Sequence, residues 1–191
     1  MIVLPTAYLA PISWYKALLS GGEVQIEVME SFPKQTYRNR CIIAGPNGVQ
    51  TLSVPVVKCE HKQLTRDVKI CYQTKWQHQH RQAIVSAYRN TPFFDYYQDF
   101  FWPLYEKEYT YLLDLNTDCY EVVEKLITNM GTLNIPISPT KEYQGKSIEH
   151  YFEGHCKSYY QIFADRQGFK DNLSIVDLLF NIGHEALLYI Q

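Results

Sequence analysis

Residues 24–29 read Val24-Gln25-Ile26-Glu27-Val28-Met29, and their apolar and polar side chains alternate. This period of two is typical of a β-strand with one buried face. Upstream, Ile2-Val3-Leu4 predicts another strand, and a helix is predicted from about Ser13 until Gly21-Gly22 ends it. A strand, a helix and a strand within so short a segment indicate a βαβ unit whose two strands are parallel.

A basic segment follows this unit. Lys34-Gln35-Thr36-Tyr37-Arg38-Asn39-Arg40-Cys41 leads directly into the apolar run Ile42-Ile43-Ala44. We predict that the basic segment is part of a strand, in which Arg38 and Arg40 point to the same side, about 6–7 Å apart at about 3.3 Å per residue. Turn residues at 45–48 separate this strand from the apolar run at 51–57, which predicts an antiparallel hairpin.

Helical patterns dominate the rest of the chain. A short strand is predicted at 67–72, and an apolar stripe then recurs every four residues, which predicts a helix from about Lys75 to Asn90. The further expected elements are two short helices around Pro103, a helix from Cys119 to Met130 capped by residues 116–118, a loop at Pro136 and Pro139, and a helix that begins at Ser174. The expected fold class is α+β: a sheet-rich N-terminal half, with the βαβ start and the antiparallel hairpin, packs with a helical C-terminal half in a single domain over residues 1–191.

Composition narrows the class of protein. The chain has 191 residues, a formal net charge of −2 and a pI near 6.3, which argues against a nucleic-acid partner. We expect no membrane span and a cytoplasmic location, because the amino terminus lacks a signal-peptide pattern and no apolar run reaches about 18 residues. Five scattered cysteines without a C-x-x-C pair indicate reduced thiols, and no metal site is predicted.

Six blocks along the chain resemble the WbqC-like protein family, in the form found in Bacteroidetes-type bacteria. The blocks lie at residues 4–9, 34–41, 52–58, 74–77, 86–94 and 172–181. The founding members of that family look like products of surface-polysaccharide (O-antigen) gene clusters, and the resemblance therefore implies a cytosolic step on an activated sugar or a related small metabolite. Many members have Gln-Pro near the start, where this chain has Leu4-Pro5.

The candidate site is centred on the basic segment. Two guanidinium groups on one face of a strand suit a phosphate or a carboxylate, with Lys34 as a third cation and Asn39 on the opposite face. The alternative is a solvated edge strand, whose charges prevent aggregation. The other predicted substrate-binding residues are Tyr8, which follows the first strand, together with Tyr37, Tyr88 and Arg89.

Simpler structural roles compete with two of these assignments. Tyr8 can pack at the end of its strand, and Arg89 can complement the dipole at the end of its helix. His80 lies on the apolar stripe of the same helix, which predicts a packed and hydrogen-bonded histidine rather than a catalytic base. The chain contains no G-x-S-x-G elbow, P-loop or G-x-G-x-x-G motif, so the sequence identifies neither a catalytic residue nor a cofactor.

Two hypotheses about function follow. The first is a transferase-type enzyme that binds a small anionic molecule through the basic segment, as a monomer or an oligomer. The second is a non-catalytic binding or scaffold protein that docks a partner on the aromatic-rich segment from Phe93 to Tyr111. An enzyme predicts a concave pocket near the basic segment and Tyr8, whereas a scaffold predicts a flat aromatic face.

Overall fold

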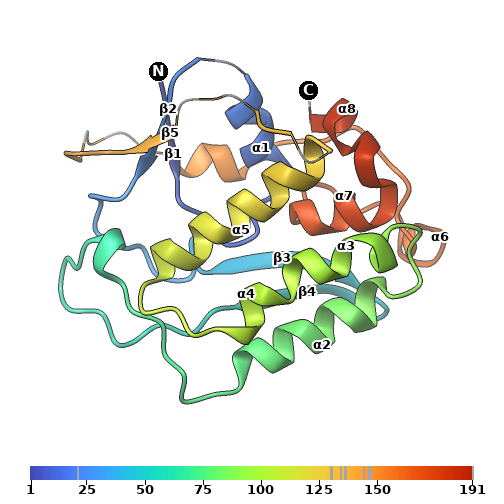
Figure 1. Cartoon of the computed structure of the whole chain (residues 1–191), viewed down its shortest axis with the longest axis horizontal. Helices are drawn as coiled ribbons and strands as arrows, with labels where there is room; N and C mark the ends of the chain where they lie inside the picture. The colour runs from blue at the N-terminus through green and yellow to red at the C-terminus, as the bar shows by residue number, and fades with distance from the viewer. Residues whose placement is uncertain are drawn as a thin grey trace.

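The computed structural model of the chain describes residues 1–20, 22–129, 131–133, 135, 137–143, 145 and 148–190. The fold is α+β, with a parallel sheet and a hairpin formed largely by the N-terminal half and with most helices in the C-terminal half (Figure 1). No helix in these ranges combines the length and the apolar character that crossing a bilayer requires.

The predicted βαβ unit is confirmed. Strand β1 (Ile2–Pro5) pairs in parallel with β2 (Val24–Glu27), and helix α1 (Ile12–Leu19) connects them. A third parallel strand, β5 (Ile137–Pro139), adds to β2 and gives the order β1-β2-β5. A loop was predicted at Pro136 and Pro139; Pro136 lies outside the described residues, and Pro139 belongs to β5. A three-residue strand that ends in a proline has too few positions to show a period of two.

The predicted antiparallel hairpin is also confirmed. Strand β3 (Arg40–Gly45) pairs with β4 (Gly48–Ser53), and Pro46-Asn47 forms the connection. Gly48 has a φ of 117°, a conformation that glycine adopts without steric cost. The side chains of Cys41, Ile43 and Leu52 are buried in the core.

Two predicted strands are wrong. Residues 34–39 form turns, and β3 begins only at Arg40. The backbone of Gln35 has a φ of 63°, which is incompatible with an extended strand. The predicted strand at 67–72 is replaced by the short 3₁₀ helix η1 (Thr65–Asp67) and by isolated bridges between Val56 and Ile70 and between Lys69 and Tyr111.

The helices occupy most of the remaining chain. The elements are α2 (Trp76–Tyr88), α3 (Phe94–Phe101), α4 (Pro103–Glu106), α5 (Leu112–Ile127), η2 (Glu149–Phe152), α6 (Ala164–Gln167), α7 (Ile175–Ile182), η3 (Gly183–Glu185) and α8 (Ala186–Ile190). The predicted helix start at Ser174 is confirmed, since its Oγ accepts a hydrogen bond from the backbone N–H of Val176 at 3.5 Å. Helix α5 starts seven residues before the predicted Cys119, so Asn116 lies inside the helix and is not its cap.

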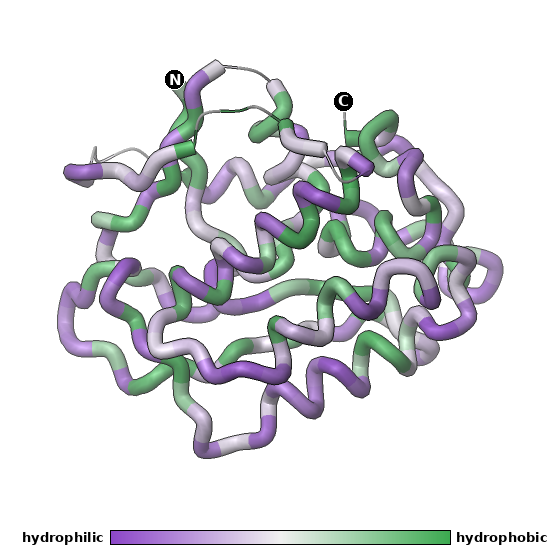
Figure 2. The backbone as a smooth tube through the Cα atoms, viewed as in Figure 1, coloured by the Kyte–Doolittle hydropathy of each residue, from purple (hydrophilic) through white to green (hydrophobic). Residues whose placement is uncertain are grey.

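Burial follows the hydropathy pattern of each helix. Figure 2 shows purple and green alternating along α5, whereas α2 is purple over its first turns and green after them, and α7 is mostly green. Every residue of α7 is buried, including the polar Asp177 and Asn181. A helix that is apolar around most of its circumference belongs in the interior. Helix α7 contacts α1, α2, α3, α5 and β3, so it lies at the centre of the helical half.

Candidate functional site

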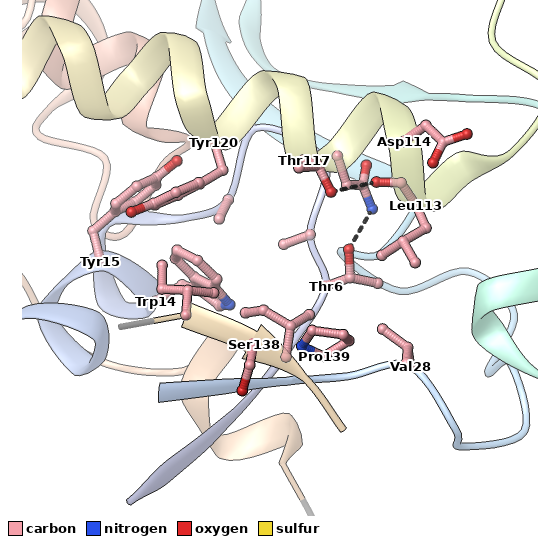
Figure 3. A pocket seen from close by; sticks show the side chains of 15 residues that line it. Thr6, Trp14, Tyr15, Val28, Leu113, Asp114, Thr117, Tyr120, Ser138 and Pro139 are labelled. Atoms are coloured by element: carbon pink, nitrogen blue, oxygen red, sulfur yellow. Dashed lines mark hydrogen bonds between the residues drawn. The ribbon is translucent and has the colours of Figure 1, made fainter. Parts of the chain in front are cut away.

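A cavity of about 290 Å³ opens where the three parallel strands end. Thr6 and Ala7 follow β1, Val28 follows β2, and Ser138 and Pro139 belong to β5. Helix α5 forms the opposite wall (Figure 3). Ligands of sheets with parallel strands bind outside the carboxyl ends of those strands. We call this cavity the sheet-edge pocket.

Aromatic rings form one end of the sheet-edge pocket. Figure 3 shows Trp14, Tyr15 and Tyr120 together at this end, with Asp114 and Leu113 at the other end. The Trp14 ring lies 4.9 Å from Tyr15 and 6.2 Å from Tyr120, measured between centroids. Its indole N–H donates to the carbonyl of Pro5 at 2.8 Å, which fixes the ring against the sheet. The pocket therefore has a rigid aromatic end and an acidic end.

Asn116 joins the two walls of the sheet-edge pocket. Its side-chain Nδ2 donates to Thr6 Oγ1 at 3.0 Å and to the backbone carbonyl of Arg38 at 2.9 Å. The residue is 3% exposed, and its Oδ1 is buried without a hydrogen-bond partner among the described residues. A buried acceptor without a partner is costly in a folded protein. Asn116 Oδ1 is therefore a polar group beside the pocket that the described residues leave unsatisfied.

The contribution of α5 to this site was not predicted from the sequence. Residues 116–118 were expected to cap a helix that begins at Cys119, so Asn116 was interpreted as a helix cap. The available signal was the apolar stripe of Leu112, Leu115 and Cys119, whose spacing of three and four residues marks a helix that already includes Asn116. Because polar side chains are seldom buried, an amide beside this buried stripe indicates a polar group with a specific structural or functional role.

The guanidinium group of Arg38 is bound by side chains of the protein itself. Its guanidinium group is fully buried and donates from Nη2 to Glu30 Oε2 at 3.0 Å and to Glu149 Oε1 at 2.8 Å. Nε contacts the second oxygen of Glu30, and Nη1 donates to Thr36 Oγ1 at 3.2 Å. Burial raises the pKa of Glu30, and the contact with Arg38 opposes that rise. The structure thus places Arg38 in an internal ion-pair cluster.

Arg40 does not share the surroundings of Arg38. It is the first residue of β3, opposite Ser53, and it is only partly buried. Its Nε is buried without a hydrogen-bond partner among the described residues, and no carboxylate of those residues lies within 4.0 Å of its guanidinium group. The expected pair of parallel guanidinium groups is absent, because the turn before β3 sends Arg38 into the interior.

Lys34 and Asn39 line a second cavity, of about 260 Å³. Lys58 and Cys59 lie on the other side of this cavity, which we call the lysine groove. Both lysine side chains are exposed. Asn39 donates to the carbonyl of Val54 at 2.9 Å, and its Oδ1 is buried without a partner among the described residues. The lysine groove therefore retains two of the predicted site residues and adds a cation that was not predicted.

The tyrosines predicted for the site lie elsewhere. Tyr37 is half-buried, and its ring packs 5.0 Å from that of Phe152. Tyr8 is fully buried, with its hydroxyl 3.0 Å from Nδ1 of His80 and 2.7 Å from the hydroxyl of Tyr105. Burial lowers the pKa of His80 to about 4, so the ring is neutral at pH 7. The prediction of a packed, hydrogen-bonded His80 is confirmed.

Tyr88 is buried at the end of α2, and the exposed Arg89 follows it. The Tyr88 hydroxyl donates to Asp177 Oδ1 at 2.9 Å, inside the helical half. Tyr159 donates to the other oxygen of Asp177 at 2.6 Å. Burial raises the pKa of Asp177 to about 6, against the opposing effect of these hydrogen bonds. Arg89 is exposed and forms the C-cap of α2, the position expected for its alternative role at the end of the helix dipole.

A third cavity, of about 460 Å³, is lined mostly by polar side chains around the start of α2. Among them Lys75, His78 and Glu108 are exposed, so this cavity is a surface depression. Within the described ranges, no cluster of three or more His, Cys, Asp or Glu residues has the geometry to hold a metal ion. The sheet-edge pocket is therefore the best-formed candidate for binding a small molecule.

Comparisons with known proteins agree with the sequence resemblance. The model of the WbqC-like protein family matches residues 24–149, which include β2, the basic segment, the hairpin and α5. Uncharacterized protein Rv1507c of Mycobacterium tuberculosis (strain ATCC 25618 / H37Rv) is 26% identical over 198 residues, which cover 84% of this chain and 84% of that protein. No solved structure matches the chain. Since the family model spans well over half of the sequence, the chain belongs to the WbqC-like protein family.

Proposed function

We propose that this chain is a transferase-type enzyme that acts on an activated sugar in surface-polysaccharide (O-antigen) biosynthesis, in the bacterial cytoplasm. The sheet-edge pocket holds the sugar. The reaction class comes from the family resemblance, in the Bacteroidetes-type form described above. The geometry of the pocket supports this location for the sugar.

One observation carries the proposal: a concave pocket lies at the carboxyl ends of β1, β2 and β5, lined by three aromatic rings and by polar groups of α5. Its volume of about 290 Å³ is at the lower end of the range of about 300–1,000 Å³ for small-molecule sites, which suits a single sugar ring. Aromatic faces pack against the apolar side of such a ring, and hydroxyl, amide and carboxylate groups bind its hydroxyls.

An activated sugar also carries phosphate, for which the lysine groove is the better candidate. Lys34 and Lys58 are exposed there, whereas Arg38 is already neutralised by Glu30 and Glu149. The described lining of the sheet-edge pocket contains no Lys, Arg or His residue. The anion-binding role predicted for the basic segment therefore rests on Lys34, with Lys58 beside it.

The scaffold hypothesis receives less support. Of the aromatic rings between Phe93 and Tyr111, Tyr96 and Tyr111 are exposed, and the others are buried or half-buried. Phe94 and Phe101, for example, pack against Phe180 with ring centroids 5.2 Å and 5.4 Å apart. These rings are part of the hydrophobic core, so this segment does not present the broad aromatic face that docking a partner would require.

Thermal-shift measurements with nucleotide sugars, nucleotides and acyl donors test the proposal. A ligand at about 100 times its Kd adds about 2.7 kcal/mol, which raises the Tm of a chain this size by about 5–10 °C. Thr117→Phe should abolish the shift, because Thr117 is exposed and lines the sheet-edge pocket, which the larger ring would fill. Glu121→Phe is the matched control, an exposed position of α5 outside the pocket lining.

Lys34→Ala and Lys58→Ala should weaken binding of the nucleotide sugar while leaving that of the free sugar unchanged. The proposal fails if no nucleotide sugar shifts the Tm of the parent protein. It fails equally if Thr117→Phe binds the nucleotide sugar as well as Glu121→Phe does.

A further inference from the structure

The hydrogen-bonding groups of the sheet-edge pocket are unequally available to a ligand. Several donors in its lining are already used within the protein. The indole N–H of Trp14 donates to Pro5, and both hydrogens of the Asn116 amide are engaged, by Thr6 Oγ1 and by the carbonyl of Arg38. The Thr117 hydroxyl donates to the carbonyl of Leu113 at 2.9 Å.

Two acceptors of the same lining have no donor among the described residues. Asn116 Oδ1 has no partner among the described residues. The orientation of this amide is fixed, because a flipped amide would place its oxygen against the carbonyl oxygen of Arg38. Thr117 Oγ1 has donated its hydrogen and retains only acceptor capacity. A ligand that bonds to Asn116 Oδ1 and Thr117 Oγ1 must therefore supply hydrogen-bond donors.

The charged groups of the pocket also favour a ligand that carries hydrogen-bond donors, because they favour a positive charge. Asp114 is exposed at the end of the pocket opposite the aromatic rings (Figure 3), and no cationic side chain of the described residues lies within 4.0 Å of its carboxylate. Since the described lining also lacks Lys, Arg and His, a phosphate or carboxylate placed here would lose water without gaining a counter-charge.

We propose that the sheet-edge pocket selects an amine-bearing sugar, with the ammonium group at the Asp114 end and the sugar ring toward Trp14, Tyr15 and Tyr120. An ammonium group supplies three donors and a positive charge, and the sugar hydroxyls supply donors for Asn116 Oδ1. The aromatic end accommodates the C–H face of the ring. This inference rests on the proposed function, because it specifies the sugar that the same pocket holds.

Ligand-observed NMR titrations of the purified chain test this selectivity, with glucosamine, glucose, N-acetylglucosamine and glucose 6-phosphate as probes. Glucosamine should bind at least about fivefold more tightly than glucose and N-acetylglucosamine, corresponding to about 1 kcal/mol. Glucose 6-phosphate should bind most weakly. The preference should disappear as the pH is raised through the pKa of the sugar's amine.

Asp114→Asn should remove the preference for glucosamine while glucose binding persists. Glu121→Gln, which removes one negative charge from an exposed position of α5 outside the pocket, should leave the preference intact. Equal binding of glucose and glucosamine, or a preference that survives Asp114→Asn, overturns the inference but leaves the sugar pocket of the proposed function in place. Binding of none of the probes also overturns the inference, whereas the proposed function is decided separately by the nucleotide-sugar screen.

Discussion

The side-chain amide of Asn116 donates a hydrogen bond to the backbone carbonyl of Arg38 at 2.9 Å. This contact links α5 to the turn that precedes β3, across 78 residues of sequence. Through it, the basic segment supports the wall of the sheet-edge pocket. The charged side chain of Arg38 points to Glu30 and Glu149.

Asn116→Ala should lower the free energy of unfolding by about 1–3 kcal/mol, because the buried carbonyl of Arg38 and the Thr6 hydroxyl lose their partner. Urea titration followed by circular dichroism measures the change. Asn90→Ala, at an exposed position after α2, should change stability by less than about 0.5 kcal/mol. Equal stability of the two variants would contradict the role assigned to Asn116.

Arg38→Met should destabilise the protein by about 3–5 kcal/mol, since it leaves the buried Glu30 carboxylate without its cation. Arg66→Met is the matched control: Arg66 is half exposed and lies 3.6 Å from Asp67, so its loss should cost less than about 1 kcal/mol. Urea midpoints of both variants provide the measurement. An unchanged midpoint for Arg38→Met would show that its ion pairs contribute nothing to stability.

Asp177 should make stability depend on pH. Burial raises its pKa in the folded protein from 3.8 to about 6, so the folded state binds the proton more tightly than the unfolded state does. The free energy of unfolding should therefore fall as the pH rises from about 4 to about 6, by up to about 3 kcal/mol, and then level off.

Asp177→Asn keeps a side chain that can accept from Tyr88 and removes the titration. In urea titrations at several pH values, the slope between about pH 4 and 6 should be smaller in this variant than in the parent. Asp95→Asn, at an exposed position of α3, is the control and should leave the slope unchanged. A parent-like slope in Asp177→Asn would assign the pH dependence to another group.

Ser174→Ala should cost about 1–2 kcal/mol, because Ser174 caps α7 and its hydroxyl also donates to the buried carbonyl of Leu9 at 2.6 Å. Thermal unfolding measured by calorimetry provides the test. Ser86→Ala, at an exposed position of α2, should be neutral or slightly stabilising because alanine has the higher helix propensity. Equal Tm values would rule out a stabilising cap at Ser174.

Gly183→Ala should be among the more damaging single substitutions, at about 2–4 kcal/mol. Gly183 has a φ of 62°, and an added Cβ would overlap the ring of Phe93. Gly168 has a φ of 72° and a ψ of 165°, a conformation essentially restricted to glycine, but open space around it, so Gly168→Ala should show only the backbone strain, about 1–3 kcal/mol. Chemical denaturation of both variants separates the two contributions, and equal costs would mean that Phe93 moves aside freely.

Local patterns predicted the elements that have enough residues to show a period. The alternation at 24–29, the four-residue stripe of α2 and the cap at Ser174 correspond to β2, α2 and α7 in the structure. The short β5 and the turns at 34–39 were not predicted, because no local pattern determines them. The conformation of β5 is set by its pairing with β2, and that of the turns by the burial of Arg38. Neither contact is visible in the neighbouring residues of the sequence.

The sequence by itself determined the α+β class, the parallel start, the hairpin and the family, because these depend on side-chain periods and on ordered blocks along the chain. Only the tertiary structure decided where a ligand can bind. Asn116 meets Thr6 across 110 residues, and Arg38 meets Glu149, the first residue of η2. Such long-range contacts determine whether a charged or polar side chain faces a cavity or another residue of the protein. The period of a segment carries no information about them.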